Sequence, residues 1–240
     1  MDAHLRAGIA IYNAGYYHAA HDAWEEYWMG VPEGPDRDFL QGLIQFTAAA
    51  YHTTTENWIG ARKLATKAQT YLDGLGEEYR EVDLQPIRQH LRALERDSER
   101  VGRAPPPRIE HGGAVIDFEA LGFDATAVAA TVLAEEWGYD EGVFGRAAEY
   151  AARDIDDGNE TSPFVALLFD FVREGGRSEP SDRASGRTSA DTSGGQRPRE
   201  GGETANRADD QVDHRDIIAQ RLSEHLDRRE SRKEDVEGLF

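Results

Sequence analysis

Cysteine is absent from this chain, and so are long apolar runs. Without cysteine there are no disulfide bonds and no thiolate ligands, so a metal site would have to use histidine, aspartate, glutamate or water. No apolar run is long enough to span a bilayer, and the amino-terminal sequence MDAHLRAG lacks the hydrophobic region of a signal peptide. We therefore expect a soluble, cytoplasmic protein with no membrane partner.

Positive charge is scarce as well. The chain carries 46 acidic residues against 27 lysines and arginines, a formal net charge of -19 at pH 7. Such a surface repels phosphate backbones, so the composition excludes a nucleic-acid partner. Only Lys63, Lys67 and Lys233 are lysines. An acidic, lysine-poor, cysteine-free surface is typical of a halophilic protein in a salt-loaded cytoplasm, and the alternative is an ordinary acidic cytosolic protein.

Apolar residues recur at helical spacing through the first hundred residues, and glycine and proline separate the runs. This pattern predicts an all-α fold, a compact bundle of antiparallel helical hairpins, whose first domain covers residues 1–104. The expected helices cover residues 3–13, 17–29, 36–52, 58–75 and 84–100, the last with Asp83 as its cap.

Consecutive prolines at 105–107 predict a domain boundary, because they cannot continue a helix and they stiffen the chain. A second short helical block is expected at residues 105–174. Its helices should cover residues 125–137, 141–155 and 163–173, with Asp124, Asp140 and Ser162 as their caps. Residues 175–211 have almost no large apolar side chains, which predicts a disordered polar linker. Residues 212–240 form a tail with a short amphipathic helix.

One helix of the first domain combines aromatic and ionisable side chains. In the expected helix at 17–29, His21 and Glu25 are four residues apart, so their side chains lie one above the other and can hold the same ion or proton. His18, one turn before His21, can join them. Trp24 and Trp28 belong to the apolar face beside this pair. Asp22 and Glu26 are interpreted as ordinary solvated helix surface.

In the next helix, residues 38–52 are nearly apolar all round, which is typical of a buried helix. A narrow polar stripe containing Gln41, Gln45 and His52 interrupts it. Buried polar groups without partners cost about 1–3 kcal/mol each, so this stripe needs polar groups opposite it. We expect the His21/Glu25 pair to supply them.

Three ordered motifs, NAGYYHAAHDAWEEYW, FLQGLIQFTAAAYH and NWIGARKLATKAQTYL, resemble the domain-of-unknown-function 309 family over about the first hundred residues. That family is a small all-helical domain labelled as a predicted metal-dependent hydrolase. The residues that match its motifs are His21, Trp24, Glu25 and Trp28, then Gln41, Gly42, Gln45 and His52, then Gly60, Ala61 and Leu64. Asp22 departs from the family pattern, which usually has glutamate there, and this weakens any role assigned to it.

The first functional hypothesis is a metal-dependent hydrolase. His21, Glu25 and His52 would hold zinc, manganese or iron, because imidazole and carboxylate groups can bind these ions and a bound ion activates water. Glu25 and Gln45 would take part in catalysis. The supporting residues would be His18, Gln41, Trp24 and Trp28. The chain contains neither a glycine-rich phosphate loop nor a G-x-S-x-G elbow.

The alternative is a non-catalytic helical module that binds a protein or a small molecule. In that case the histidine, glutamate and glutamine side chains form a structural polar network inside the bundle. The four tryptophans and the amphipathic tail also leave room for a homodimer.

Overall fold

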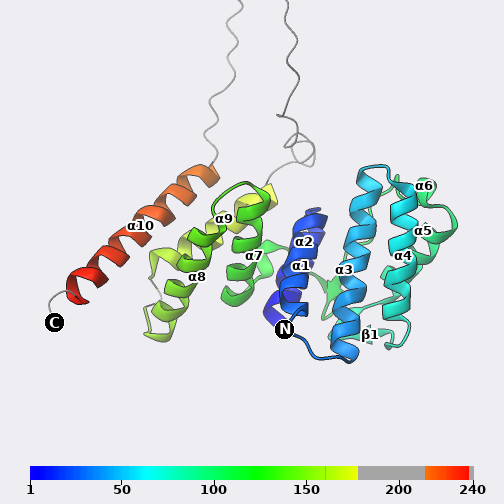
Figure 1. Ribbon diagram of the computed structural model, residues 1–240, viewed down its shortest axis with the longest axis horizontal. Helices are drawn as coiled ribbons and strands as arrows, with labels where there is room; N and C mark the ends of the chain where they lie inside the picture. The colour runs from blue at the N-terminus through cyan, green and yellow to red at the C-terminus, as the bar shows by residue number, and fades with distance from the viewer. Residues whose placement is uncertain (160, 178–213, 238–240) are drawn as a thin grey trace, which may run out of the picture.

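The computed structural model describes residues 1–159, 161–177 and 214–237, and helices dominate them (Figure 1). The all-α class is therefore confirmed. The helices of the described residues are α1 (Asp2–Asn13), α2 (Tyr17–Trp28), α3 (Pro35–Thr54), α4 (Trp58–Leu72), α5 (Gln85–Arg96), α6 (Ser98–Val101), the 3-10 helix η1 (Phe118–Ala120), α7 (Phe123–Glu136), α8 (Glu141–Asp156), α9 (Pro163–Arg177) and α10 (His214–Glu237).

Two predicted helices end differently from the sequence pattern. The helix expected at 84–100 is two helices, because the Asp97 backbone is extended between α5 and α6 and its side chain accepts a hydrogen bond from Arg100 N. The helix expected to reach residue 75 ends at Leu72. Arg88 of α5 donates to the carbonyl oxygens of Leu72 and Leu75, so a side chain distant in sequence satisfies the end of α4.

The described residues also form four short strands that the sequence does not predict: β1 (Glu78–Tyr79), β2 (Val82–Asp83), β3 (Glu110–His111) and β4 (Ala114–Val115). They form an antiparallel sheet in the order β1-β2-β3-β4, with Val82 paired to His111. Each strand has two residues, which is too short for any alternation of polar and apolar residues to be read.

The predicted caps have different outcomes. Asp140 is the cap of α8 and accepts a hydrogen bond from Gly142 N, as expected. Asp83 accepts a hydrogen bond from Gln85 N, but the cap residue of α5 is Leu84, so the predicted position of this cap is wrong. The cap at Asp124 is wrong, because α7 begins at Phe123 after Gly122. Ser162 Oγ donates to the buried carboxylate of Asp154.

The core is continuous from α1 to α10. Helices α1 and α2 lie in the middle of the molecule, between α3 to α6 on one side and α7 to α10 on the other (Figure 1). Asn13, at the end of α1, holds the segment after the prolines in place. Its side-chain amide donates hydrogen bonds to the carbonyls of Ile109 and Ile116, and its oxygen accepts one from Ile109 N. The domain boundary at 105–107 stays a prediction.

The carboxy-terminal helices are longer than expected. Helix α9 continues to Arg177, and α10 packs against α8 and α9 with Ile218, Leu222 and Leu226 buried. Residues 175–177 of the predicted disordered linker therefore belong to α9, and the remainder of that linker lies outside the described residues. In the described part of the chain, no helix is both long and apolar enough to cross a membrane.

Gly8 of α1 lies close against Trp24 of α2. A Cβ atom built at Gly8 would overlap the indole of Trp24, which is 0% exposed. We expect Gly8→Ala to lower the free energy of unfolding by about 1–3 kcal/mol, because a well-packed core resists added volume. Denaturant unfolding measures this change.

Gly145→Ala in α8 is the matched control, because nothing outside its own helix lies within 4 Å of the added Cβ. There the substitution should stabilise the protein by about 0.5–1 kcal/mol through helix propensity. Equal effects at the two positions would contradict the packing argument.

Candidate metal centre

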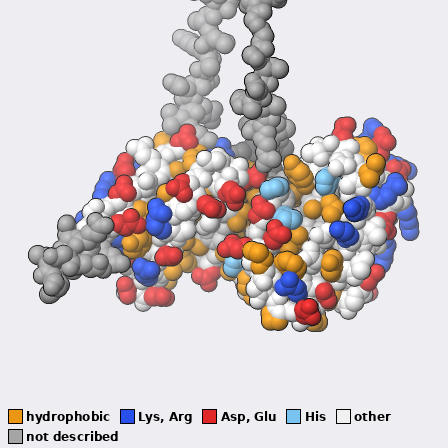
Figure 2. All heavy atoms as spheres, in the orientation of Figure 1, with side chains coloured by type: hydrophobic (Ala, Val, Ile, Leu, Met, Phe, Trp, Pro, Cys, Tyr) orange, Lys and Arg blue, Asp and Glu red, His pale blue; other side chains and the backbone are white. Residues whose placement is uncertain are grey.

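Helix α2 places ionisable side chains along one edge because its other face is buried. Ala19, Ala20, Ala23 and Trp24 are all at most 1% exposed and pack into the core. At 100° per residue, this leaves His18, His21, Asp22 and Glu25 at the solvent boundary. Figure 2 shows histidine and acidic side chains gathered near the middle of this face, where α1, α2 and α3 lie in Figure 1.

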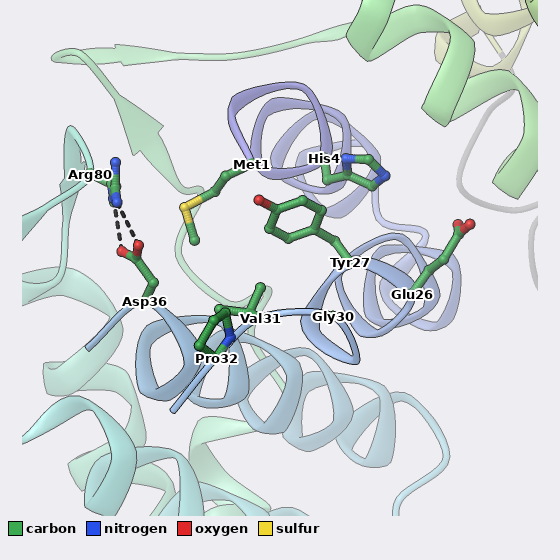
Figure 3. A pocket seen from close by; sticks show the side chains of 9 residues that line it. All are labelled: Met1, His4, Glu26, Tyr27, Gly30, Val31, Pro32, Asp36 and Arg80. Atoms are coloured by element: carbon green, nitrogen blue, oxygen red, sulfur yellow. Dashed lines mark hydrogen bonds and ion pairs between the residues drawn. The ribbon is translucent and has the colours of Figure 1, made fainter. Parts of the chain in front are cut away.

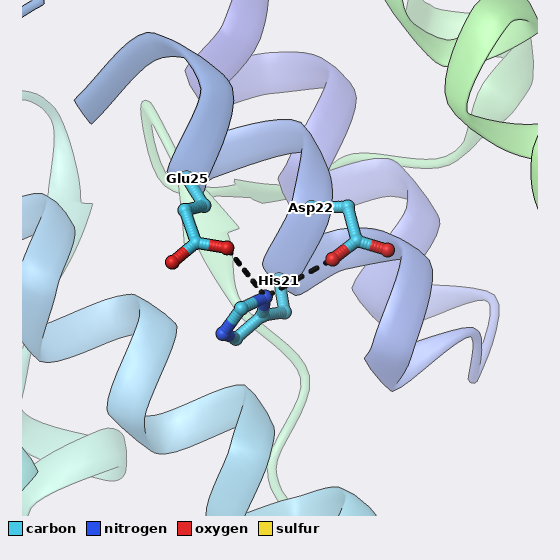
Figure 4. A group of neighbouring side chains, drawn as sticks. All are labelled: His21, Asp22 and Glu25. Atoms are coloured by element: carbon cyan, nitrogen blue, oxygen red, sulfur yellow. Dashed lines mark hydrogen bonds and ion pairs between the residues drawn. The ribbon is translucent and has the colours of Figure 1, made fainter. Parts of the chain in front are cut away.

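His21 is at the centre of this group (Figure 4). Its Nδ1 atom lies 3.1 Å from Oδ1 of Asp22 and 3.7 Å from Oε2 of Glu25. One ligand atom from each of these three residues lies within 4.8 Å of the others. The side chains are 28%, 36% and 48% exposed for His21, Asp22 and Glu25, so water and solutes reach the group.

The surroundings of His21 favour its charged form. The hydrogen bond to Asp22 raises the pKa of His21 above its usual 6.5, and the negative charges of Glu25 and Asp22 act in the same direction. Partial burial opposes them by disfavouring the charged imidazolium. The group therefore attracts positive charge.

His18 extends the same edge by one turn. Its Nδ1 lies 3.1 Å from Oδ2 of Asp22 and 3.8 Å from Oε2 of Glu136, the last residue of α7. The Tyr51 ring packs against the imidazole in a T-shaped arrangement, with the ring centres 5.8 Å apart. His18, predicted as a supporting residue, thus lies beside the cluster.

His52, predicted as a third ligand, lies outside this group. Its Nδ1 is 2.9 Å from Nδ2 of Asn57, and the Asn57 oxygen accepts a hydrogen bond from Gly60 N at the start of α4. His52 therefore supports the cap of the next helix. Among the described residues, His21, Asp22 and Glu25 are the one histidine and carboxylate group close enough to share an ion.

Most of the other predicted site residues pack against neighbouring side chains. Trp24 is fully buried and its Nε1 donates to the carbonyl of Leu5 at 3.4 Å. Trp28 packs under the guanidinium of Arg37, whose carbon lies 3.9 Å from the ring centre. Gln41 and Gln45 on α3 are half-buried, and the buried Oε1 of Gln45 has no hydrogen-bond partner among the described residues.

Asp22 and Glu136 are the residues that sequence reasoning missed. Asp22 follows His21 directly and stands four residues after His18, so the spacing His-x-x-His-Asp-x-x-Glu contained its signal. Asp22 was expected to be solvated surface, but its carboxylate contacts both His18 and His21. Glu136 had no signal, because it comes from a helix distant in sequence.

A pocket of about 480 Å³ lies elsewhere, around the end of α2 (Figure 3). Its lining residues are Met1, His4, Glu26, Tyr27, Gly30, Val31, Pro32, Asp36 and Arg80. Arg80 forms a two-pronged ion pair with Asp36, and this pair lowers the pKa of Asp36. Burial lowers the pKa of His4, which packs against Tyr27. The pocket shares no residue with the His21 group.

Residues 5–64 match the model of a family described as "Domain of unknown function (DUF309)". The matched segment contains most of α1, all of α2 and α3, and the first half of α4, so it includes all three residues of the His21 group. None of the curated proteins matches this chain.

The pKa of His21 tests the electrostatics of the group. We expect Asp22→Asn to lower the pKa of His21, because the largest cause of the raised value is removed. The raised pKa stabilises the fold fully below the unfolded value of about 6.5, and that contribution is lost as the pH rises through the folded pKa. Titration of the His21 ring resonances by NMR measures the shift in metal-free protein.

Glu26→Gln is the control, since Glu26 is an exposed carboxylate on the same helix that does not contact His21. It should leave the titration of His21 unchanged. An unaltered His21 pKa in Asp22→Asn would contradict the assigned cause.

Proposed function

Residues 5–64 belong to the domain-of-unknown-function 309 family, and from this premise we propose that the domain binds a divalent metal ion at His21, Asp22 and Glu25 and uses it for hydrolysis. The observation that carries the proposal is the convergence of one imidazole nitrogen and two carboxylate oxygens within 4.8 Å. The ligand set differs from the sequence hypothesis by having Asp22 in place of His52.

The distances support this fit. Bonds from zinc to histidine or carboxylate are about 2.0–2.2 Å long, so two ligands of one ion lie no more than about 4.2 Å apart. The separations from His21 Nδ1 to Asp22 and Glu25, 3.1 Å and 3.7 Å, are within this limit. Because the side chains are partly exposed, positions around an ion would remain for water or a substrate.

The donor set indicates which ions fit. One imidazole and two carboxylates without any thiolate are suitable ligands for zinc, manganese or iron. Carboxylate oxygens are suitable ligands for these ions, whereas a soft ion such as copper(I) prefers sulfur. The cofactor we propose is therefore zinc, manganese or iron.

The chemistry of the site would divide among its residues. When bound, a divalent ion polarises a substrate carbonyl or phosphoryl oxygen and lowers the pKa of water. His21 would contribute the lone pair of Nδ1 in its neutral form, and Asp22 would contribute the carboxylate oxygen that lies beside that nitrogen. One Glu25 oxygen is turned toward His21 and the other points away (Figure 4), so the second can accept a proton from an attacking water. Gln45 would orient water or substrate.

A second candidate function is a non-catalytic helical module for a protein or small-molecule partner. The observation that favours it is the hydrogen-bonded chain from His52 through Asn57 to Gly60 N, in which two of the motif positions serve a helix cap. In that reading the His21 group is a polar network at the surface of the bundle.

Metal binding separates these candidates. After removal of metal by a chelator, isothermal titration of zinc or manganese in high salt should show binding by the full chain. We expect His21→Ala and Asp22→Asn each to weaken binding by roughly tenfold or more, because each removes a direct contact. His52→Ala should bind within about threefold of the wild-type protein. Equal losses in His52→Ala and His21→Ala would restore the ligand set expected from sequence.

Catalysis needs its own measurement. With carboxylic and phosphoric p-nitrophenyl esters as probe substrates, we expect turnover that the chelator abolishes and added metal restores. Glu25→Gln should lower kcat by about 10²-fold or more, because it removes a general base. Binding of metal without any turnover of either class would favour the non-catalytic module.

A further inference from the structure

We propose that one exposed row of side chains on α4 binds an acidic amphipathic helix of a partner protein. This row, the α4 ridge, consists of four residues spaced four apart: Ile59, Lys63, Lys67 and Tyr71. Residues four apart lie one above the other on a helix, so the ridge runs along most of α4. Helix α3 lies between α2 and α4 (Figure 1), so this surface does not depend on the His21 group or on a metal ion.

The buried face of α4 explains why the ridge points outward. Four side chains of this helix are 0% exposed and pack toward α3 and α5: Ala61, Ala65, Ala68 and Leu72. At 100° per residue, the α4 ridge lies on the opposite side of the helix from these residues. The packing of the bundle therefore accounts for the buried face but not for the residues of the ridge.

The two ends of the α4 ridge are apolar. Ile59 is 85% exposed and Tyr71 is 38% exposed. A single exposed apolar residue is common on protein surfaces and needs no explanation. Two on one row, about 18 Å apart along the helix axis, can contact both ends of one bound helix. Covering them would remove apolar surface from water, which favours binding.

The centre of the α4 ridge is basic. Helix α4 contains Arg62, Lys63 and Lys67 and no acidic residue, although the chain as a whole has 46 acidic residues. Lys63 and Lys67 are exposed, and neither forms an ion pair with another described residue. Figure 2 shows lysine and arginine side chains gathered at the end of the molecule where α4 and α5 lie in Figure 1.

The carboxylates near α4 leave these two lysines unpaired. Glu95 of α5 accepts a hydrogen bond from Oγ1 of Thr66 at 2.6 Å, so it contacts α4 beside the ridge and not on it. Helix α8, by comparison, pairs its basic Arg153 with Glu149 one turn away. The two charges at the centre of the ridge are thus available to carboxylates of a partner.

The order of residues along the ridge defines the partner. A helix with apolar, acidic, acidic and apolar residues at the same spacing complements it in either direction, because this order reads the same when reversed. The acidic side chains provide specificity, and the apolar contacts remain when salt screens the charges. A nucleic acid fits this surface less well, because the net charge of -19 repels a phosphate backbone that extends past the ridge.

A designed peptide tests the proposal. The probe is a fluorescein-labelled helical peptide with leucine, glutamate, glutamate and leucine at four-residue spacing, and fluorescence anisotropy measures its binding to the metal-free full chain. At low salt we expect the double variant Lys63→Glu/Lys67→Glu to bind about tenfold more weakly or worse, because like charges then face each other. Ile59→Ala should weaken binding by about threefold, because an apolar contact is lost. Added salt should weaken binding by the wild-type protein.

The double variant Arg108→Glu/Arg221→Glu is the matched control. It makes the same change in net charge at two exposed arginines outside α4 that form no ion pair with the described residues. It should bind the peptide within about twofold of the wild-type protein. All the substituted side chains are exposed, and circular dichroism checks that each variant is folded.

Acetylation of lysines maps the contact independently. The lysines of the chain are Lys63, Lys67 and Lys233, and the last of these belongs to α10. Bound peptide should slow the acetylation of Lys63 and Lys67 and leave that of Lys233 unchanged. Mass spectrometry of the digested protein measures the three rates.

The possible results separate this partner from other occupants. No binding of the peptide at low salt, or equal binding by the lysine variant and its control, would overturn the proposal. Tighter binding of an oligonucleotide than of the peptide would overturn it in favour of nucleic acid. Self-association of the wild-type protein that the lysine variant loses, measured by analytical ultracentrifugation, would overturn it in favour of a second copy of this chain. Because metal-free protein is used, failure of the metal centre does not affect these outcomes.

Discussion

The close packing of α2 into the centre of the molecule is the constraint on which the rest of the structure depends. Trp24 has no exposed surface and lies against Gly8 of α1, where no side chain would fit. The small residues Ala19, Ala20 and Ala23 let the neighbouring helices approach the same face. Because this face of α2 is fixed, the rotation of the helix is fixed too. Its polar edge is consequently held where α3 and α7 border it.

The polar edge of α2 brings carboxylates close to two histidines. In a chain of net charge -19, three carboxylates surround two histidines at one place on the surface. The hydrogen bond to Asp22 is the largest cause of the raised pKa of His21, and the charges of Glu25 and Asp22 act in the same direction. A proton on the imidazole offsets part of this negative charge, and the proposed divalent ion would offset more of it. The proton and the proposed ion would compete for Nδ1 of His21, so the affinity of the proposed site would depend on pH.

The second helical block packs on the first through specific contacts. Helix α7 lies against α1 and α2, and the hydroxyl of Tyr16 donates to the carbonyl of Gly175 in α9. The buried Asp154 of α8 accepts hydrogen bonds from Ser162 and from Arg229 of α10, so the carboxy-terminal helix also has a specific attachment. A carboxylate buried in this way needs both partners, because an unpaired buried charge is costly. The fold therefore connects α10 to α2 through a continuous set of contacts.

Much of the fold could be read from local patterns, since helical periodicity and caps such as Asp140 depend on residues a few positions apart. The sequence by itself determined the helices, the absence of thiolate chemistry and the pairing of His21 with Glu25, because a helix turn imposes that contact. Only the tertiary structure decided that Glu136 meets His18 and that His52 turns to Asn57. The same holds for the end of α4, where Arg88 binds the last carbonyls. These contacts depend on how whole helices pack against one another. That packing is decided by many side chains together, and their spacing along the sequence does not predict it.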